Sequence, residues 1–247
     1  MDIRLTPEHI EALRQIDTCA LANAIEVFGV RLRNEGFADS SIHCMFGSMP
    51  PMAGYAVTAR IRCSNPSPTG HTYFERTEWW DHILNTPAPR VFVMQDVDER
   101  PGFGAFLGEV HTNILKALGC AGAAPNGAVR DLPAVEALGI PLFAGGVAVS
   151  HAYAHFIDFG GEVDVGGLKV KPGDLLHGDR HGLISVPLQI AKDIPAVAAR
   201  MREVDQKIIA VCSSPEFSVD KLRAAIEKYK SNSPDPQTSE AGDEIKN

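Results

Sequence analysis

Hydrophobic positions recur at two periods along the first part of the chain, and the change of period predicts where helices give way to strands. The pair Thr6-Pro7 is a helix-start signal, and hydrophobic residues then follow at three-residue spacing. Near residue 54 the hydrophobic positions begin to alternate with polar ones, as on a half-buried strand. The elements predicted here are a helix from Thr6-Pro7, a helix from Asp17 or Thr18 to Gly29, a strand over 54–63, a turn-rich segment over 64–72 and a helix over 75–84.

The middle of the chain has the most regular pattern. It predicts a strand over 90–95, a glycine-rich loop over 102–108, a helix over 109–118, a strand over 120–124, a helix over 133–138 and a strand over 141–144. Alternating strands and helices of this kind imply an α/β fold with parallel strands and right-handed crossovers.

The last part of the chain changes pattern again. Short strands separated by Gly, Pro and Asp are predicted over 162–186, and two helices over 188–212 and 218–229. The tail, 231–247, has no apolar pattern and is predicted to be disordered. We find no internal repeat or linker, so residues 1–230 are expected to form a single domain.

Composition narrows the functional classes. The chain has 247 residues, of which 45% are hydrophobic, and a formal net charge of -8 (23 Lys and Arg against 31 Asp and Glu). These values argue against a disordered chain and against a basic nucleic-acid binder. The five cysteines include no C-x-x-C pair, and neither a signal peptide nor an apolar run of about 20 residues is present. A cytoplasmic protein is therefore expected.

The segment GFGAFLGE (102–109) follows a predicted strand and opens a predicted helix. Its amides would face an anion with the help of the helix dipole. The spacing G-x-G-x-x-x-G departs from a dinucleotide fingerprint, and no acidic ribose ligand follows the next strand. A loop for a small carboxylate or phosphate fits better, and a glycine turn required only for close packing is the alternative.

The segment NGAVRD (126–131) lies at the next strand-to-helix junction, where open α/β sheets place ligands. Asp131 is positioned to be the N-cap of the following helix, and this structural role is the favoured one from the pattern alone. The alternative pairs Asp131 with Glu109 around Mg²⁺, which takes one or two carboxylates and keeps several waters. Arg130 would suit an oxo-acid carboxylate or an enolate oxygen.

Three histidine patterns have a possible chemical role. His151 and His155 would share a helix face, His177 and His181 flank Asp179 in a hairpin-like segment, and His82 follows Trp79-Trp80. For each, a surface or core histidine is favoured, because no further metal ligands lie nearby in the sequence.

Taken together, GFGAFLGE, NGAVRD and the stretch from HAYAHF to GDLLHGDRHGLISV resemble the RraA-like family, over about residues 17–186. That family includes class II pyruvate aldolases that act on 4-hydroxy-4-methyl-2-oxoglutarate and 4-carboxy-4-hydroxy-2-oxoadipate, and the regulator of ribonuclease E activity. The resemblance implies an αββα sandwich assembled as a homotrimer or a dimer of trimers, with sites between subunits.

The resemblance also implies a division of labour in the site. Asp131 would hold Mg²⁺ or Mn²⁺, with Glu109 acting through a metal-bound water. Arg130 would stabilise the pyruvate enolate, and His82 would lie near the substrate. An acid on a neighbouring subunit's C-terminal helix would be Asp205, with Glu203 as the fallback. The residues whose amides would receive the pyruvate carboxylate are Gly104, Ala105, Phe106 and Leu107.

The implied reaction is the metal-dependent cleavage of a 4-hydroxy-2-oxo di- or tricarboxylic acid to pyruvate and a second oxo acid, with oxaloacetate decarboxylation as a side activity. The pocket walls are expected to include Trp79, Trp80 and the region His71–Glu78. The alternative is a non-catalytic regulator that binds a protein such as ribonuclease E. The helices after residue 186 favour the enzyme, because the aldolases carry their second acid there.

Overall fold

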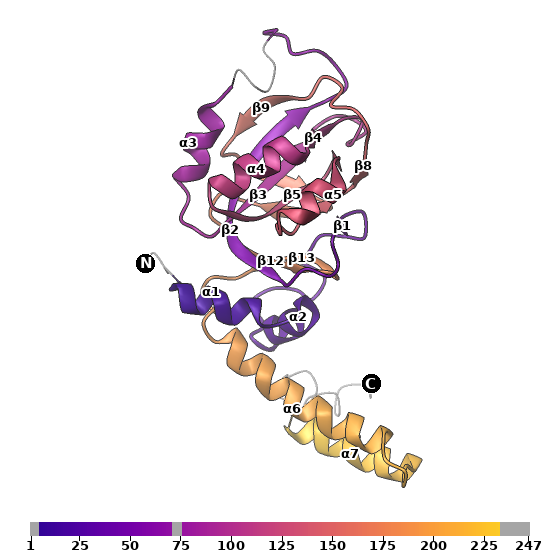
Figure 1. The fold of residues 1–247 in the computed structure, drawn as a ribbon. Helices are drawn as coiled ribbons and strands as arrows, with labels where there is room; N and C mark the ends of the chain where they lie inside the picture. Colours follow the sequence, from indigo (N-terminus) through magenta and orange to yellow (C-terminus); the bar gives the residue numbers. More distant parts are fainter. Residues whose placement is uncertain (1–4, 71–75, 233–247) are drawn as a thin grey trace, which may run out of the picture.

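The computed structural model describes residues 5–70 and 76–232 and confirms the α/β class (Figure 1). In its main sheet three parallel strands lie side by side, and the antiparallel strands extend the sheet on one side of them only. The parallel strands are β2 (Met52–Arg62), β3 (Arg90–Asp96) and β5 (Cys120–Pro125), and the antiparallel ones are β9 (His155–Phe159), β12 (Leu175–Asp179) and β13 (Gly182–Val186).

Strand β2 organises the sheet. It pairs with β3 along one side, and with β12 and then β9 along the other. The sequence predicted a half-buried strand, and this was wrong: β2 is buried along nearly its whole length, because side chains pack on both of its faces. Val57 and Ile61 belong to the cluster on one face, whereas Ala56 belongs to the cluster on the other.

Three short helices cover the first face of this sheet (Figure 1). They are α3 (Glu78–Leu84), α4 (Glu109–Ala117) and α5 (Leu132–Ala137), as the hydrophobic pattern predicted to within a few residues. Trp79, Leu115 and Val135, one from each helix, are buried there. The second face is covered by the hairpin of β10 (Val163–Val165) and β11 (Leu168–Val170).

A second, small parallel sheet lies on the α4–α5 side. It consists of β4 (Ala105–Leu107), β6 (Ala128–Val129) and β8 (Gly146–Val147). The predicted loop over 102–108 thus contains a strand, because its residues 105–107 are fully buried and pair with β6. The strand predicted over 141–144 divides: Leu142 bridges β5, while β7 (Phe143–Ala144) pairs with β1 (His43–Cys44).

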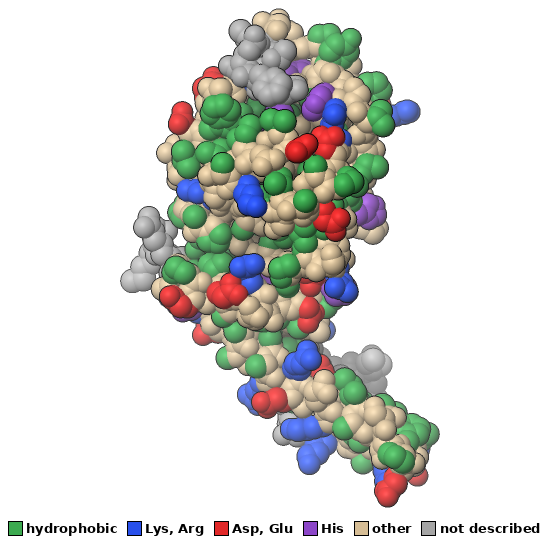
Figure 2. Space-filling model, viewed as in Figure 1, with side chains coloured by type: hydrophobic (Ala, Val, Ile, Leu, Met, Phe, Trp, Pro, Cys, Tyr) green, Lys and Arg blue, Asp and Glu red, His purple; other side chains and the backbone are tan. Residues whose placement is uncertain are grey.

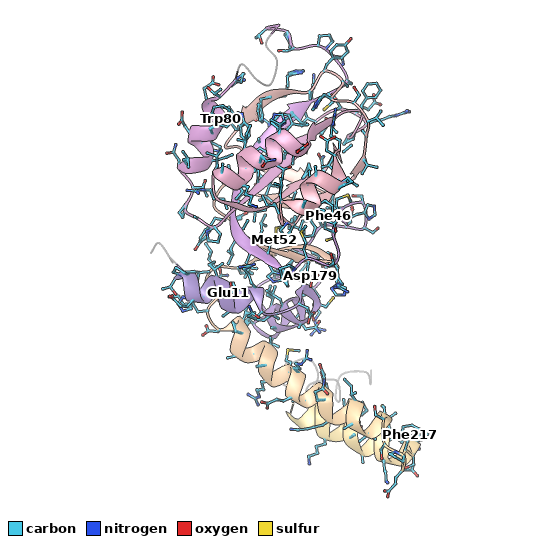
Figure 3. The ribbon with its side chains drawn as sticks, in the orientation of Figure 1. Glu11, Phe46, Met52, Trp80, Asp179 and Phe217 are labelled. Carbon is cyan, nitrogen blue, oxygen red and sulfur yellow. The ribbon has the colours of Figure 1, made fainter. Side chains whose placement is uncertain are left out.

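The N-terminal helices α1 (Pro7–Arg14) and α2 (Thr18–Val27) pack against the β12–β13 end of the main sheet. Buried polar contacts join them to β12, near the labelled Asp179 in Figure 3. The Asp179 carboxylate accepts the Thr18 N–H at 2.9 Å. His177 donates from Nε2 to the Leu13 carbonyl (3.2 Å), and its Nδ1 lies 3.1 Å from the Thr18 hydroxyl. His177 is therefore a core histidine, as the sequence favoured.

Helices α6 (Ile194–Cys212) and α7 (Val219–Asn232) form an arm that extends away from the sheets (Figure 1). The predicted start of the first arm helix at 188 was wrong. Residues 188–193 form turns, in which Ile190 and Ala191 are buried beside α1 and α2, and Pro195 lies in the first turn of α6. The tail was predicted to be disordered, and its residues from 233 onward lie outside the described residues. Among the helices that the structure describes, none is long and apolar enough to cross a membrane.

Candidate active site

The candidate site lies where the strands of the small sheet end. Gly108 follows β4, Arg130 follows β6 and Ala148 follows β8. The backbone holds these ends together, since Arg130 N–H donates to the Leu107 carbonyl and Ala148 N–H to the Val129 carbonyl, both at 3.0 Å. Carboxyl ends of parallel strands meet at one edge of a sheet, so the loops after them converge.

Asp131 has an unusual backbone conformation for a non-glycine residue, with φ at 56° in the left-handed region. It precedes α5, but its side chain makes no cap hydrogen bond with that helix. Its Oδ2 instead accepts the Glu109 N–H (3.2 Å), and its Oδ1 accepts Nε of Arg130 (3.2 Å). By position Asp131 is the N-cap residue of α5, as predicted, but its carboxylate does not cap that helix, because the left-handed backbone turns it from α5 to the start of α4.

The neighbouring Gly108 is required by this arrangement. A Cβ at residue 108 would lie 2.5 Å from Oδ2 of Asp131 and 2.9 Å from Cγ of Arg130. Glycine is therefore needed here for space as well as for backbone freedom, because any larger residue would overlap both side chains of the Arg-Asp pair.

The electrostatics of the site keep Asp131 ionised. The hydrogen bond from the Glu109 amide, followed by the contacts with Arg130, lowers the pKa of this carboxyl below its usual value. The amide belongs to the N-terminus of α4, whose dipole also favours negative charge. An exposed carboxylate that is charged at neutral pH is a suitable ligand for a hard cation.

The donor set fits a cation that keeps most of its waters. Glu109 is exposed on the first turn of α4, next to the carboxylate that its amide binds. Over residues 5–70 and 76–232, no group of three or more His, Cys, Asp or Glu side chains is placed to hold a metal ion. Mg²⁺ needs only one or two protein carboxylates, so Asp131 with a nearby Glu109 meets its requirement.

The predicted carboxylate-binding segment is buried, and two of its amides have partners inside the chain. Ala105 N–H donates to the Ser150 carbonyl (2.9 Å), and the Gly104 amide faces the Cys63 thiol. A Cβ at residue 104 would lie 2.4 Å from the His151 carbonyl oxygen, so this glycine allows the loop after β8 to lie against β4. Binding of a carboxylate by residues 104–107 stays a prediction.

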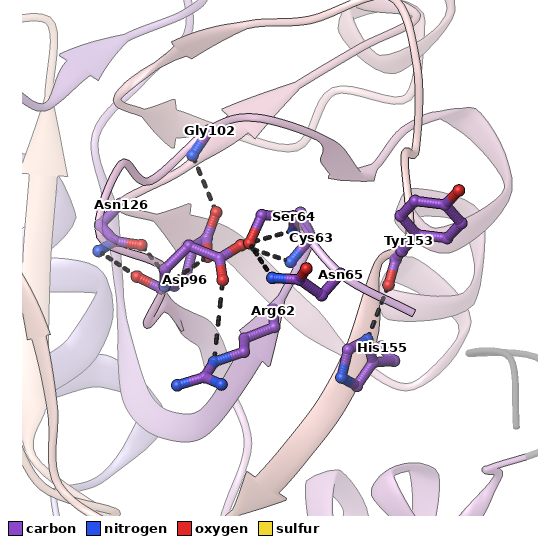
Figure 4. Close-up of polar contacts among 10 residues, drawn as sticks. Arg62, Cys63, Ser64, Asn65, Asp96, Gly102, Asn126, Tyr153 and His155 are labelled. Atoms are coloured by element: carbon purple, nitrogen blue, oxygen red, sulfur yellow. Dashed lines mark hydrogen bonds and ion pairs between the residues drawn. The ribbon is translucent and has the colours of Figure 1, made fainter. Parts of the chain in front are cut away.

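The start of the glycine-rich segment is anchored by Asp96, which sequence reasoning missed (Figure 4). This buried carboxylate, at the end of β3, accepts the Gly102 N–H at 2.8 Å. The side chain of Asn126, from the end of β5, accepts the Asp96 N–H (2.6 Å) and donates to its carbonyl (3.2 Å). The polar residues at both strand ends were the available signal.

Histidines approach the site in a way that the sequence did not predict. His151 and His155 are not on one helix: His151 lies in a turn after β8, and His155 begins β9. The charge of His151 is one of the smaller causes of the lowered pKa of Asp131. His111 of α4 is buried against Phe106, with ring centroids 4.4 Å apart, and burial lowers its pKa to about 4.

Two predicted catalytic residues are not brought to Asp131 within one chain. Asp205 lies on α6, at the opposite end of the molecule from α4 and α5 (Figure 1), and lines a groove of about 470 Å³ between α2 and α6. His82 of α3 packs on Phe159, with centroids 5.3 Å apart. Burial lowers the pKa of His82, whose Nε2 is buried without a hydrogen-bond partner.

The two tryptophans that were predicted to line the pocket lie in different environments. Trp79 is a core residue at 2% exposure, packed among Phe92, Phe106 and Phe156, so its assignment to a pocket wall was wrong. Trp80, the next residue, lies on the outer side of α3 with 38% exposure (Figure 3). Of the predicted wall region His71–Glu78, residues 71–75 lie outside the described residues.

Comparison with known proteins now identifies the family. The RraA-like family, described as Aldolase/RraA, matches residues 18–185, which include every loop of the site. The chain belongs to the RraA-like family. A Halalkalibacterium halodurans protein named "Putative 4-hydroxy-4-methyl-2-oxoglutarate aldolase" is 32% identical over 116 residues. That match covers 43% of this chain and about half (55%) of the relative.

Solved structures agree with this RraA-like fold. An uncharacterized protein from Pseudomonas syringae pv. tomato superposes with a TM-score of 0.69 at 21% identity, covering 89% of this chain and 94% of that one. Streptomyces coelicolor RraAS2, described as an unusual member of the RNase ES inhibitor RraA protein family, gives a TM-score of 0.64 at 22% identity, covering 82% and 96%. At these identities the structures establish the fold and not the activity.

Proposed function

We propose that this RraA-like protein is a divalent-metal-dependent pyruvate aldolase. It would cleave a 4-hydroxy-2-oxo di- or tricarboxylic acid to pyruvate and a second oxo acid, and decarboxylate oxaloacetate as a side activity. The observation that carries this proposal is the carboxylate of Asp131, which is turned from α5 toward the N-terminus of α4 and paired with Arg130. A residue kept in a costly backbone conformation at a convergence of loops is typical of a functional site.

Asp131 would hold Mg²⁺ or Mn²⁺, with Glu109 acting on a water of the ion's shell. When bound, the cation would supply Lewis-acid polarisation of the 2-oxo group. Arg130 would donate to the oxygen at C2, where negative charge develops as the C3–C4 bond breaks. A guanidinium held beside its carboxylate before substrate binds needs little rearrangement, and such preorganised charge stabilises a transition state effectively.

A neighbouring subunit would supply Asp205 to complete the site. This proposal is supported by the position of Asp205 on the arm, partly exposed and distant from its own Asp131. The protein would therefore act as a homotrimer or a dimer of trimers. His82 stays a prediction for a residue near the substrate.

The test is a lactate-dehydrogenase-coupled pyruvate assay over a panel of 4-hydroxy-2-oxo acids and oxaloacetate, with and without EDTA. We expect turnover with Mg²⁺ or Mn²⁺ and none with EDTA. Asp131→Asn, which keeps the side-chain shape and tolerates a left-handed backbone, should abolish turnover and weaken Mn²⁺ binding without lowering Tm. Asp174→Asn, a change of a carboxylate in a distant turn, is the matched control.

Metal-independent turnover, or full activity of Asp131→Asn, would refute the proposal. The second candidate, a non-catalytic regulator, predicts a different result. For a regulator we expect two results: no acid in the panel yields pyruvate, and the protein captures ribonuclease E.

A further inference from the structure

The three strands of the small sheet are entered from one place, beside Asp96 at the end of β3 (Figure 4). The Asp96 carboxylate accepts the N–H of Gly102, in the segment that leads into β4, at 2.8 Å. The side chain of Asn126, shortly before β6, accepts the Asp96 N–H (2.6 Å) and donates to the Asp96 carbonyl (3.2 Å). Gly145, directly before β8, lies so close to Asn126 that a Cβ there would be 2.2 Å from the Asn126 carbonyl oxygen. The entries to β4, β6 and β8 are therefore joined to one another through Asp96 and Asn126.

The Asp96 side chain has a fixed orientation at this junction. The residue is 2% exposed, and while its Oδ2 accepts the Gly102 N–H, its Oδ1 accepts the Asp98 N–H at 3.1 Å. A Cβ on Gly127, the residue directly before β6, would lie 3.2 Å from the Cβ of Asp96. A buried carboxylate whose two oxygens both accept hydrogen bonds is held in place from both sides. Asp96 thus gives the entries to β4 and β6 a fixed separation.

The strands of the small sheet are too short to fix this separation by themselves. β4 has three residues, and β6 and β8 have two each. Strands in globular proteins usually have about 3–10 residues, so the backbone hydrogen bonds of this sheet are few. The register between β4 and β6 also shifts between Ala105 and Leu107. Contacts at the entries to the strands are therefore needed to define how β4 lies on β6.

The opposite ends of the same strands carry the candidate site. After β4 and β6, the Arg130 N–H donates to the Leu107 carbonyl at 3.0 Å, and the Glu109 N–H donates to Oδ2 of Asp131 at 3.2 Å. A movement of β4 along β6 would lengthen both hydrogen bonds and carry Glu109 away from the Asp131 carboxylate. The geometry of the site at one end of the small sheet is thus set at its other end.

We propose that Asp96 is a positioning residue for the candidate site: it joins the main sheet to the entries of β4 and β6, and so holds Glu109 in place against the Arg130-Asp131 pair. This inference rests on the proposed aldolase function and adds to it a residue that acts on the metal ligands through the small sheet. Changing groups that orient metal ligands in this indirect way typically lowers metal affinity or activity by about 10- to 100-fold.

Asp96→Asn removes the anchor and preserves the shape of the side chain. Asparagine has one carbonyl oxygen, so it accepts from Gly102 or from Asp98, and its NH₂ group then faces the other N–H. Asn126→Ala removes the second link, which joins Asp96 to the entry of β6, and leaves the Asp96 carboxylate in place. It is the variant that decides the question if Asp96→Asn does not fold.

Two other aspartates provide matched controls. Asp98→Asn removes a charge near the same end of β3, but one oxygen of Asp98, Oδ2, accepts the N–H groups of both Cys63 (2.7 Å) and Ser64 (2.8 Å), so asparagine retains both hydrogen bonds. Asp179 resembles Asp96 because it is buried and each of its oxygens accepts a backbone N–H group, but it lies at the junction of β12 and α2. Asp179→Asn therefore reproduces the loss of a buried hydrogen bond outside the small sheet.

The full chains are compared by calorimetric titration with Mn²⁺, by the coupled pyruvate assay at saturating Mn²⁺ and, without metal, by hydrogen exchange of the backbone amides over 102–112. For Asp96→Asn we expect Mn²⁺ affinity and kcat each to fall by about tenfold or more, and exchange over 102–112 to become faster. Asn126→Ala should change the same quantities in the same direction. Asp98→Asn and Asp179→Asn should keep wild-type Mn²⁺ affinity and exchange over 102–112, although Asp179→Asn should lower Tm.

Wild-type Mn²⁺ affinity and exchange in Asp96→Asn, or in Asn126→Ala if Asp96→Asn does not fold, would overturn the positioning role while the aldolase function stands. An equal loss of affinity in Asp179→Asn would also overturn it, because the effect would then be one of stability alone. An equal loss in Asp98→Asn would assign the effect to charge. If the wild-type protein neither binds Mn²⁺ nor forms pyruvate, the proposed function itself fails, and Asp96 has no site to position.

Discussion

At the residue scale, Asp131 illustrates what the sequence determines and what only the backbone decides. The motif NGAVRD placed an Arg-Asp pair at the end of a strand, and this placement is correct. The residue types were compatible with both a helix cap and a metal ligand. The direction of the carboxylate depends on φ at Asp131 and on the close approach of Gly108 to the Arg-Asp pair, and neither can be read from residue types alone.

Substitution of Gly108 by alanine is predicted to weaken metal binding without unfolding the protein. The new Cβ would overlap the Asp131 carboxylate (2.5 Å) and displace it from the Glu109 amide. We expect Mn²⁺ affinity, measured by calorimetric titration, to fall by about 10-fold or more, the usual cost of disturbing groups that orient a ligand. Gly161→Ala is the control, because a Cβ there has no neighbour within 4 Å. Wild-type affinity in Gly108→Ala would mean that the carboxylate is not the ligand.

At the scale of elements, the long, strongly periodic segments were predicted well and the short ones were not. The pattern located α1, α2, β3, α4 and β5 closely. It missed β4, because three buried residues inside a glycine-rich segment carry no periodicity. It assigned Trp79 to a pocket wall, since a hydrophobic residue on a short helix does not reveal which face its tertiary neighbours will cover. Nor could it show that His177 joins α1 and α2 to β12.

That junction predicts a specific loss of stability in acid. Burial lowers the pKa of His177 to about 4 in the folded protein, below the value of about 6.5 expected when the chain unfolds. Between these values the unfolded state binds more protons, so the free energy of unfolding decreases as the pH falls through this window. His177→Gln should lower Tm at pH 7, where its hydrogen bonds are lost, but reduce the slope of Tm against pH between about 6.5 and 4.

The buried His111 shares this pKa shift, so the slope should become smaller and not vanish. His43→Gln, an exposed position on β1, is the control and should leave both Tm and slope unchanged. An unaltered slope in His177→Gln would show that the ring is not held neutral in the fold. Differential scanning calorimetry over this pH range makes the measurement.

At the scale of the whole molecule, apolar side chains are exposed in several places, two of which bear on the candidate site and the arm. One is the loop region around the candidate site, with Phe103 (65%), Val147 (62%) and Val149 (95%). The other is the end of the α6–α7 arm, where Figure 2 shows hydrophobic side chains and Figure 3 labels Phe217. Exposed apolar patches of this kind mark interaction surfaces. The family resemblance implied a site between subunits. The two exposed apolar surfaces support this expectation, because each would be covered in an assembly.

Val149→Lys is therefore predicted to disrupt assembly and turnover together. A charged side chain at this position would have to be desolvated in an interface, whereas in an isolated chain it would remain in water, so the substitution should affect assembly and not folding. Light scattering after size-exclusion chromatography should show a smaller particle, and pyruvate formation should fall in proportion, because Asp205 of a second copy would no longer reach the site.

Mn²⁺ binding should persist, since Asp131 and Glu109 belong to the same chain. Leu32→Lys, at another exposed apolar position (66%) that follows α2, is the control and should stay assembled and active. A monomeric Val149→Lys protein with full turnover would show that each chain holds a complete site, and Asp205 would then have no part in the chemistry.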